Sequence, residues 1–597
     1  MFFDNLKREY RNLFCIVFTG IAEKTGATDE KTKKTIENAI KIDTPFDESK
    51  GDLAVPCFFM SGIMKSNPAN IAAEVAKAFS FAMGKNGSTM KALFFDRSEA
   101  SGGYVNVFLD HCSALGALSE KYKSDGNSIF SNSTLAGEKI MVEFSCPNTN
   151  KTLHLGHMRN DALGNCVSNL LKASGAQVMR VNLVNDRGIH ICKSMLAYEK
   201  FMKGKTPETE HVKSDKFIAD CYVMYNDYEK EHEEEAKEQI AQMLRKWESG
   251  DEEVMKLWKL TRKWALDGIN ETYRNTNISF DKTYFESELY KDGKELVMKG
   301  LEAGAFYKDE TGAIMVDIDG KKKVLLRSDG TSIYLTQDLG TAWKRYKDYP
   351  YTQCVYVVGN EQIDHFKTLF AVLAKLKAPF AGKLYHLSYG MVNLPDGKMK
   401  SREGTVVDAD DLLADLEKLS LEAMSEEISE EKREGVAHNV ALAALNYYLL
   451  SFTPGKDMIF DKQKSISFTG NTGPYIQYSA ARISSILRKE MPGDCVDFSK
   501  IIPKKYDSLT LPVERMLVLY LMSYQDFVQK AAKSFDPSLV VTHLYNLCKI
   551  FSRYYHDVPI LKSDDKTKTE RLGLLVMVLA AIRNGMGLLG IPYLPEM

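Results

Sequence analysis

The sequence predicts a multidomain α/β protein with three parts: a central doubly wound parallel sheet, an α+β domain before it and an α-helical bundle after it. Three observations support this. Apolar runs such as 178–184 and 354–358 suit strands buried on both faces, with helical segments between them. The last part of the chain is helical by its apolar period. A length of 597 residues also exceeds what one hydrophobic core usually serves.

Residues 1–120 are expected to form the N-terminal α+β domain. An amphipathic helix over 6–24 opens it, and residues 103–108 alternate between apolar and polar as a half-buried strand does. Taken alone, this pattern predicts only a small globular domain.

Residues 138–455 are expected to form the Rossmann-like central domain. A strand over 139–144 opens it, a helix over 158–174 follows, and a further strand is expected over 384–394. A charged helical insertion over about 205–275 interrupts the pattern. Its densest charges, at 229–237, are more typical of a solvated helix face than of a nucleic-acid contact.

Residues 456–597 are expected to form the helical bundle, with helices over 465–489, 511–533, 538–555 and 568–589. The glycines at 585, 587 and 590 match a dinucleotide-binding pattern. They follow a helix instead of a strand, and only seven residues come after them. A helix C-terminus capped by glycine is the better interpretation.

Bulk composition is that of an ordinary soluble protein, with 44% hydrophobic and 26% charged residues. The 78 basic and 80 acidic residues give a net charge of −2, so any RNA site must be a local basic surface. Ten cysteines without paired spacing favour free thiols and a reducing compartment over disulfides or a metal site. The apolar run 572–582 is too short to cross a bilayer, and no signal-peptide core is present. We expect a cytoplasmic protein that binds no membrane.

The most informative tract is His154-Leu155-Gly156-His157, which lies between the strand at 139–144 and the helix at 158–174. Free N–H groups and the helix dipole favour anions at such a place, and α/β proteins bind ligands there. Gly156 has no side chain, so a flat base could approach the backbone. Alone, the four residues could also be ordinary helix-start residues or two ligands of a zinc site, although no third ligand accompanies them.

The second tract, residues 397–405, is a glycine-bounded loop with three cations and a serine: Lys398, Lys400, Arg402 and Ser401. Such a loop suits a polyphosphate that gains charge as it leaves. By itself it could equally be a solvated basic loop.

Together, His-x-Gly-His and a Lys-Met-x-Ser loop about 240 residues later resemble a class I aminoacyl-tRNA synthetase. Further tracts, in the right order along nearly the whole chain, narrow the resemblance to the arginyl-tRNA synthetase family. These are 143–148 (Glu-Phe-Ser-Cys-Pro-Asn), 185–190 (Asn-Asp-Arg-Gly-Ile-His), 334–338 (Tyr-Leu-Thr-Gln-Asp), 359–362 (Gly-Asn-Glu-Gln) and 472–483, which begins Thr-Gly-Pro-Tyr-Ile-Gln-Tyr.

The resemblance implies that L-arginine and ATP form arginyl-adenylate and pyrophosphate, and that arginine then passes to the 3′-terminal adenosine of tRNA(Arg) with release of AMP. Catalysis would be positioning and neutralisation of growing negative charge, with no protein nucleophile. Mg²⁺ would travel with ATP, and no dedicated protein metal site is expected. The N-terminal domain would contact the tRNA elbow. The partners would be tRNA, arginine and ATP, with no DNA, and the chain is expected to be a monomer.

Site residues follow from the family's motif positions. His154 and His157 would donate hydrogen bonds to phosphate in the transition state, and Lys398 would bind the leaving pyrophosphate. ATP binding would also use Gly156, Met399 and Ser401. Arginine would be held by six side chains: Glu143, Asn148, His157, Tyr334, Asp338 and Gln362.

The basic loop departs from the usual class I pattern, because Ser401 stands where a second catalytic lysine is common. Lys151, in the turn before His154, matches a lysine that can compensate in the family, and Lys400 and Arg402 are the alternatives. In the helical domain, Tyr475, Tyr478 and Arg482 are candidates for stacking on unpaired tRNA bases, although each tyrosine could instead belong to the core.

Other readings remain open on sequence alone. Another class I synthetase is the nearest, but a glutamate pocket should present cations and a cysteine enzyme should carry zinc ligands. A small nucleotidyltransferase of the same sheet class is usually much shorter. A non-catalytic tRNA-binding paralogue is disfavoured because the motif residues are intact.

Overall fold

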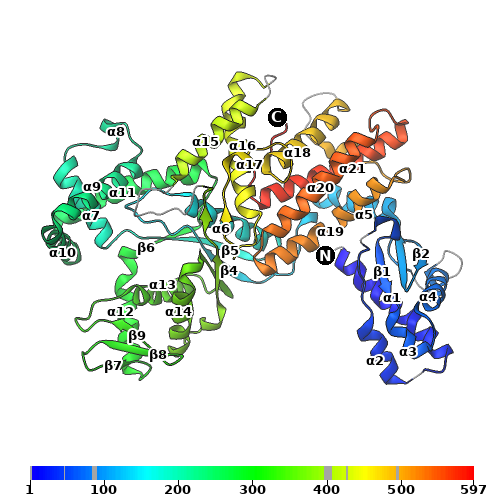
Figure 1. Cartoon of the computed structure of the whole chain (residues 1–597), viewed down its shortest axis with the longest axis horizontal. Helices are drawn as coiled ribbons and strands as arrows, with labels where there is room; N and C mark the ends of the chain where they lie inside the picture. The colour runs from blue at the N-terminus through cyan, green and yellow to red at the C-terminus, as the bar shows by residue number, and fades with distance from the viewer. Residues whose placement is uncertain are drawn as a thin grey trace.

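The computed structural model describes residues 3–27, 29–45, 47–83, 91–395, 407–424, 428–491 and 497–597. Figure 1 shows three regions along the colour gradient: a blue N-terminal domain at one end, a cyan-to-green sheet with its insertions at the other, and an orange-to-red helical bundle between them. The predicted fold class is confirmed.

The N-terminal domain packs helices against a three-stranded antiparallel sheet of order β1-β3-β2. Its apolar strand face and the buried face of α1 share one core, which includes Phe14, Phe79 and Val107. Its main elements are α1 (Phe3–Lys24), α2 (Glu30–Ala39), β1 (Leu53–Pro56), α3 (Ser61–Met64), α4 (Pro68–Met83), β2 (Phe95–Ser101), β3 (Tyr104–Leu109) and α5 (His111–Asp125).

The N-terminal domain is joined to the helical bundle through a buried carboxylate. Asp52 accepts hydrogen bonds from the Leu109 backbone N–H at 2.8 Å and from Arg515 Nε, on α19 (Pro512–Ser534), at 2.8 Å. Because Asp52 is fully buried, this charged pair fixes the domain against the bundle.

The central sheet is parallel throughout, with strand order β11-β10-β4-β5-β6. Alternate residues of β4 belong to two different cores: Ile140 and Val142 face the side of α6, and Met141 faces the side of α13 and α14. Both faces are therefore covered, as expected for a doubly wound sheet. The elements are β4 (Lys139–Glu143), α6 (Leu155–Ala173), β5 (Gln177–Val184), α7 (Ile189–Ala197), β6 (Lys282–Phe285), α12 (Glu286–Glu302), α13 (Tyr334–Asp348), β10 (Gln353–Gly359), α14 (Ile363–Lys375), β11 (Leu384–Tyr389) and β12 (Val392–Asn393).

One expected strand is shorter than predicted. The run 384–394 divides into β11, which ends at Tyr389, and the two-residue β12, which pairs with β13 (Met458–Ile459). The break falls at Gly390, where a Cβ atom would lie 2.4 Å from the Lys456 backbone carbon. Apolar character alone does not reveal that the chain changes strand partner there.

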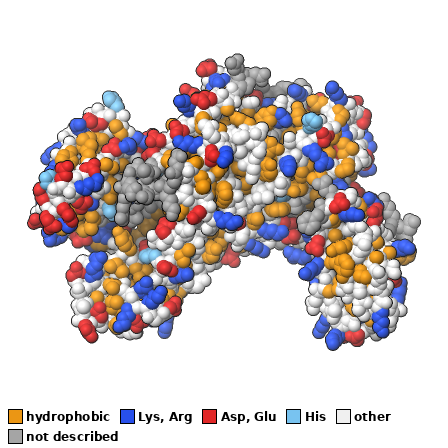
Figure 2. Space-filling view, viewed as in Figure 1, with side chains coloured by type: hydrophobic (Ala, Val, Ile, Leu, Met, Phe, Trp, Pro, Cys, Tyr) orange, Lys and Arg blue, Asp and Glu red, His pale blue; other side chains and the backbone are white. Residues whose placement is uncertain are grey.

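Two insertions follow α7 and α12 along the chain. The first forms α8 (Pro207–Glu210), α9 (Ser214–Glu231), α10 (Glu233–Ser249) and α11 (Glu252–Asn275), with its own core. The second is an antiparallel sheet of β7 (Tyr307–Lys308), β8 (Ile314–Ile318) and β9 (Lys321–Leu326), which the periodicity did not predict. In Figure 2 acidic side chains gather on the first insertion, at the left, while basic and acidic side chains are interspersed elsewhere on that face.

The C-terminal bundle consists mainly of α18 (Gly473–Lys489), α19 (Pro512–Ser534), α20 (Ser538–Asp557) and α21 (Asp565–Leu588). Three helices precede it along the chain: α15 (Ala409–Ala423), α16 (Glu430–Leu450) and α17 (Lys462–Ser465). By length and composition α21 could cross a membrane, but 83% of its most apolar window is buried in the protein. Gly590 follows α21 with φ of 67°, so the late glycines do include a helix C-terminal cap.

Candidate active site

The candidate site lies where the strand order reverses. From β4 the chain passes to β5 on one side, while β10 lies on the other, and ligands bind outside the carboxyl ends of strands at such a point. A hollow of about 540 Å³ opens there. Its lining includes the predicted residues Asn148, His154, Gly156, His157 and Gln362.

The turn after β4 has an unusual backbone conformation. Ser145 and Cys146 have φ angles of 74° and 53°, in the left-handed region that costs a non-glycine residue about 1 kcal/mol or more. Two asparagines hold it: Asn160 Oδ1 accepts from the Ser145 N–H at 2.6 Å, and Asn182 Oδ1 accepts from the Cys146 N–H at 3.1 Å. This turn directs residues 147–154 across the strand ends.

Hydrogen bonds fix the tautomers of both motif histidines. His154 caps α6, and its Nδ1 accepts the Gly156 N–H at 3.1 Å. His157 Nδ1 accepts the His154 N–H at 3.2 Å. A neutral imidazole that accepts at Nδ1 carries its proton on Nε2. The two rings, with centroids 3.9 Å apart and planes tilted by 49°, are therefore set to act as Nε2–H donors.

Position 156 requires glycine for a steric reason that the motif did not reveal. A Cβ atom there would lie 2.9 Å from His154 Cε1 and 3.0 Å from His154 Nδ1. Any side chain would push the His154 ring out of its capping position.

Both histidines remain neutral near pH 7. Desolvation, with the Lys151 charge adding to it, lowers the pKa of His154 to about 4. Desolvation also holds the pKa of His157 well below its usual value, and His154 and Lys151 add to the effect. The half-buried Lys151 thus lies close enough to act electrostatically on both rings.

The residues predicted for the basic loop, Lys398, Met399, Lys400 and Ser401, lie outside the described residues. Both flanks of that loop are at the hollow. Gly390, Met391 and Val392 line it. On the other side, Val407 accepts the Leu155 N–H at 3.1 Å, directly beside His154.

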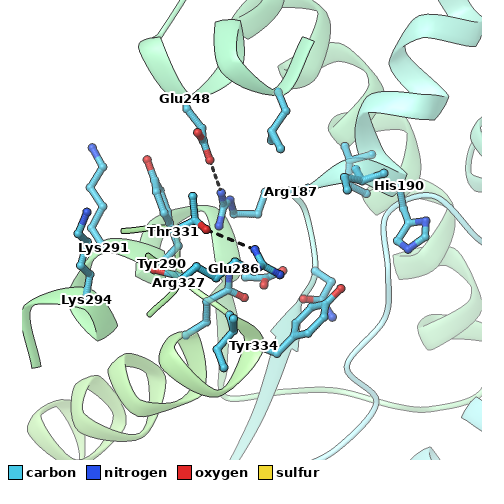
Figure 3. Close-up of a pocket in the computed structure, with 18 of the residues that line it drawn as sticks. Arg187, His190, Glu248, Glu286, Tyr290, Lys291, Lys294, Arg327, Thr331 and Tyr334 are labelled. Atoms are coloured by element: carbon cyan, nitrogen blue, oxygen red, sulfur yellow. Dashed lines mark hydrogen bonds and ion pairs between the residues drawn. The ribbon is translucent and has the colours of Figure 1, made fainter. Parts of the chain in front are cut away.

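A larger hollow of about 990 Å³ adjoins the first and shares Asn148 and Asn185 with it. Figure 3 shows Arg187 at its centre, with Glu286, Tyr290 and Tyr334 around it. The Arg187 guanidinium bonds Glu248 at 3.0 Å and lies 4.1 Å from the Tyr290 ring centroid. Tyr334 projects into this hollow and is 75% exposed.

Glu286, at the start of α12, was missed by sequence reasoning. Burial raises its pKa to about 7; Arg187 opposes the rise, and Asp338 and Asp186 add to it. Glu286 has no motif of its own. The motif Asn185-Asp186-Arg187 nevertheless pointed to this part of the fold. Asp186 accepts the N–H of Ser287, the residue after Glu286, at 2.9 Å, and it pairs with Arg262 at 2.7 Å.

The two carboxylates predicted for arginine have different environments. Glu143 is 4% exposed and pairs with Arg345, itself 1% exposed, on α13. Burial raises the pKa of Glu143 and Arg345 opposes that rise. Asp338 is partly exposed and accepts a hydrogen bond from His365 Nε2 at 2.5 Å. Glu143 thus has a resident cation, whereas Asp338 pairs with His365 and acts electrostatically on Glu286. Neither Glu143 nor Asp338 is among the residues that line the two hollows.

The tRNA candidates on α18 do not all lie together. Arg482 lies over the rings of Tyr478 at 4.5 Å and Tyr555 at 4.7 Å, and these two tyrosines are 36% and 42% exposed. Tyr475 is half-buried and contacts the Tyr545 ring at 6.0 Å. The sequence missed Tyr555, which is about 70 residues from the motif.

Comparison with known proteins agrees with this architecture. Residues 122–462 match the model of the class I tRNA synthetase catalytic domain of the arginine type, 476–597 match the DALR anticodon binding domain, and 20–109 match the arginyl tRNA synthetase N terminal domain.

Whole proteins match as well. The arginine–tRNA ligase of Treponema denticola is 46% identical over 603 aligned residues, covering 100% of each chain, and that of Borrelia turicatae is 42% identical with the same coverage. The Thermus thermophilus arginyl-tRNA synthetase structure shares the fold, with a TM-score of 0.76, 23% identity, and coverage of 99% of this chain and 100% of that one. The chain therefore belongs to the arginyl-tRNA synthetase family of class I aminoacyl-tRNA synthetases.

Proposed function

We propose that this protein is an arginine–tRNA ligase whose two adjoining hollows hold ATP and arginine. The observation that carries the proposal is the pair of neutral, Nε2–H-donating histidines at the switch point, directly beside a group of carboxylates. The first arrangement suits phosphate, and the second suits a guanidinium.

In the first step the arginine carboxylate attacks the α-phosphate of ATP and pyrophosphate leaves. His154 and His157 donate from Nε2 to phosphate oxygens as negative charge grows. They need not gain or lose a proton, because each bond uses a proton already on Nε2. In the second step the arginyl group passes to the terminal adenosine of tRNA(Arg) and AMP is released.

Arginine is proposed to lie between the hollows. Asn148, Gln362 and His157 hold its amino and carboxylate groups. Asp338 binds the guanidinium, with Tyr334 one helical turn away on the same helix. A bidentate carboxylate–guanidinium pair supplies the specificity.

Two further carboxylates are assigned different parts in that pocket. Glu286, which lines the larger hollow, adds a further carboxyl group to the pocket. Glu143 is buried and its charge is balanced by Arg345, so it contributes less to arginine affinity than Asp338 does.

ATP is proposed to lie in the smaller hollow, against Gly156 and the two histidines, with Mg²⁺ on its phosphates. Lys398, Met399 and Ser401, which lie outside the described residues, are the proposed loop contacts to ATP, since both flanks of their loop are at the hollow. Lys151 is the proposed replacement for the missing second lysine, with Lys400 as the alternative. Among the residues that the structure describes, no group of three or more His, Cys, Asp or Glu is placed to hold a metal.

The tRNA is proposed to bind the bundle through Tyr478, Arg482 and Tyr555, with Tyr475 supporting α18 from the core side. The nine described cysteines are free thiols, which fits a cytoplasmic protein. We also propose that the enzyme acts as a monomer.

The test is ATP–pyrophosphate exchange with each amino acid, with and without tRNA. Exchange that occurs with arginine and with no other amino acid would support the proposal. Exchange with a different amino acid would indicate another class I synthetase. If the folded protein binds tRNA but exchanges with none, it is a non-catalytic tRNA-binding paralogue.

A further inference from the structure

We propose that His365 is a positioning residue for Asp338, whose protonation state sets how strongly the site binds arginine. The idea rests on the proposed arginine pocket and extends it. It assigns a part to a side chain that touches neither ATP nor arginine in the mechanism above.

The pairing is close and well placed. His365 Nε2 lies 2.5 Å from Asp338 Oδ2. The two side chains come from different helices, α14 and α13, and remain 26% and 32% exposed. The Asp338 carboxylate therefore remains accessible to a ligand while the imidazole is bonded to one of its oxygens, which restrains the Asp338 rotamer before arginine arrives.

The charged groups around the pair are of both signs. Asp338 acts on the Glu143 carboxylate of β4, which Arg345 balances, and on Glu286 of α12. His365 acts on His386 of β11, which Glu361 also faces. The pKa of His386 is lowered, mainly by burial, so that histidine is neutral near pH 7.

His365 differs from the other histidines of the site. The hydrogen bond to Asp338, and then its charge, raise the pKa of His365 above the ordinary value, although burial opposes this. The pKa of His365 is thus shifted in the opposite direction to those of His154 and His157.

The sign of the effect follows from charge. Below its pKa, His365 is an imidazolium that neutralises Asp338 and repels an arriving guanidinium. Above it, neutral His365 still donates from Nε2 while the carboxylate keeps its full charge for the substrate. By linkage, arginine binding displaces one proton, and the arginine KM falls as pH rises through the pKa of His365, by up to about tenfold per pH unit below it.

The experiment measures arginine KM and kcat by tRNA-dependent pyrophosphate exchange from pH 6 to 8.5. The variant His365→Gln keeps a donor near the Nε2 position but cannot be charged, and we expect its arginine KM to be nearly independent of pH. The variant His365→Ala loses the donor, and we expect arginine KM to rise about tenfold at pH 8. The ATP KM should be unchanged in both.

The matched control is His438→Gln, which alters a similar pair outside the lining of both hollows, His438 Nδ1 to Glu417 Oε1 at 2.7 Å. It should keep the wild-type profile. A His365→Gln profile identical to wild type would overturn the inference. If Asp338→Asn also leaves arginine KM unchanged, the arginine pocket itself is wrong; if Asp338→Asn raises it while His365→Gln has no effect, only the part assigned to His365 fails.

Discussion

The ion pair of Arg345 with Glu143 makes a quantitative prediction. Replacing Arg345 by Met keeps much of the side-chain volume but leaves Glu143, only 4% exposed, without its cation. Breaking one partner of a buried pair costs about 3–5 kcal/mol. At roughly 2–4 °C per kcal/mol for a large domain, the unfolding transition of the catalytic domain should fall by about 10 °C.

The pH dependence of this loss has a definite sign. With Arg345 gone, burial and then the Asp338 charge act on Glu143 and raise its pKa further above the unfolded value, opposed only by the Cys146 hydrogen bond. The folded state then takes up a proton more readily than the unfolded state. The deficit is therefore largest at neutral and alkaline pH and shrinks as pH falls through the folded pKa.

The assay is thermal melting followed by circular dichroism at pH 6 and pH 8. The double variant Glu143→Gln with Arg345→Met removes the stranded charge and should recover most of the loss, because a neutral buried amide is far cheaper than an unpaired carboxylate. Two results would refute this reasoning: Arg345→Met melting within about 2 °C of wild type at pH 8, or the double variant being no more stable than the single one. Either would mean that Arg345 does not neutralise a buried Glu143 charge.

The remaining predictions concern histidines and the bundle surface. His157→Ala should lower kcat in pyrophosphate exchange about 100-fold. His157→Gln, whose amide nitrogen approaches the Nε2 position, should recover part of the lost kcat, whereas His157→Asn should not. Equal kcat values for the Gln and Asn variants would show that Nε2 donates nothing. His543 is buried and its pKa is lowered to about 3, so the unfolded state binds more protons than the folded state below pH 6.5. Chemical denaturation should therefore show that the bundle loses about 3 kcal/mol of stability between pH 6.5 and 4. A His543→Phe variant that loses as much stability over this pH range would contradict the assignment to His543. Arg482→Ala and Tyr555→Leu should each raise tRNA KM about tenfold in aminoacylation and leave arginine KM alone, as loss of one stacked base predicts; Tyr475→Phe is the control, and an equal effect there would point to the bundle core instead.

Sequence periodicity was sufficient for the elements that bury one consistent face. The helix expected over 568–589 appears as α21, and the β4 strand appears within one residue of its expected end. Periodicity failed where tertiary contacts decide the outcome, as at Gly390, where the chain leaves β11 to pair with β13. The β8–β9 hairpin was missed although Asp319-Gly320 stands between two apolar runs, which is a usable hairpin signal.

The candidate site was predicted as residue types, but its charge states could not be. His154 and His157 are recognisable by spacing, yet their neutrality and tautomer depend on burial and on two backbone N–H groups. Glu143 and Asp338 are both carboxylates in family motifs, and only the fold shows that one has a buried arginine partner and the other a histidine. Arg345 and His365 are unremarkable in sequence because their importance lies in what they contact.

The distribution of charge explains how one cleft can accept substrates of opposite sign. If arginine and ATP bind as proposed, a cationic side chain and a polyanion must lie side by side without exchanging places. The smaller hollow presents neutral N–H donors on which the Lys151 charge acts, and so disfavours a guanidinium. On the other side, the Glu286 carboxyl group lines the larger hollow and feels the charge of Asp338, which favours a guanidinium over phosphate. The uncharged Asn148 and Asn185 line both hollows. Neutral histidines suit this arrangement better than protonated ones, because an imidazolium beside the arginine carboxylate would stabilise the ground state as well as the transition state, and only the difference accelerates the reaction.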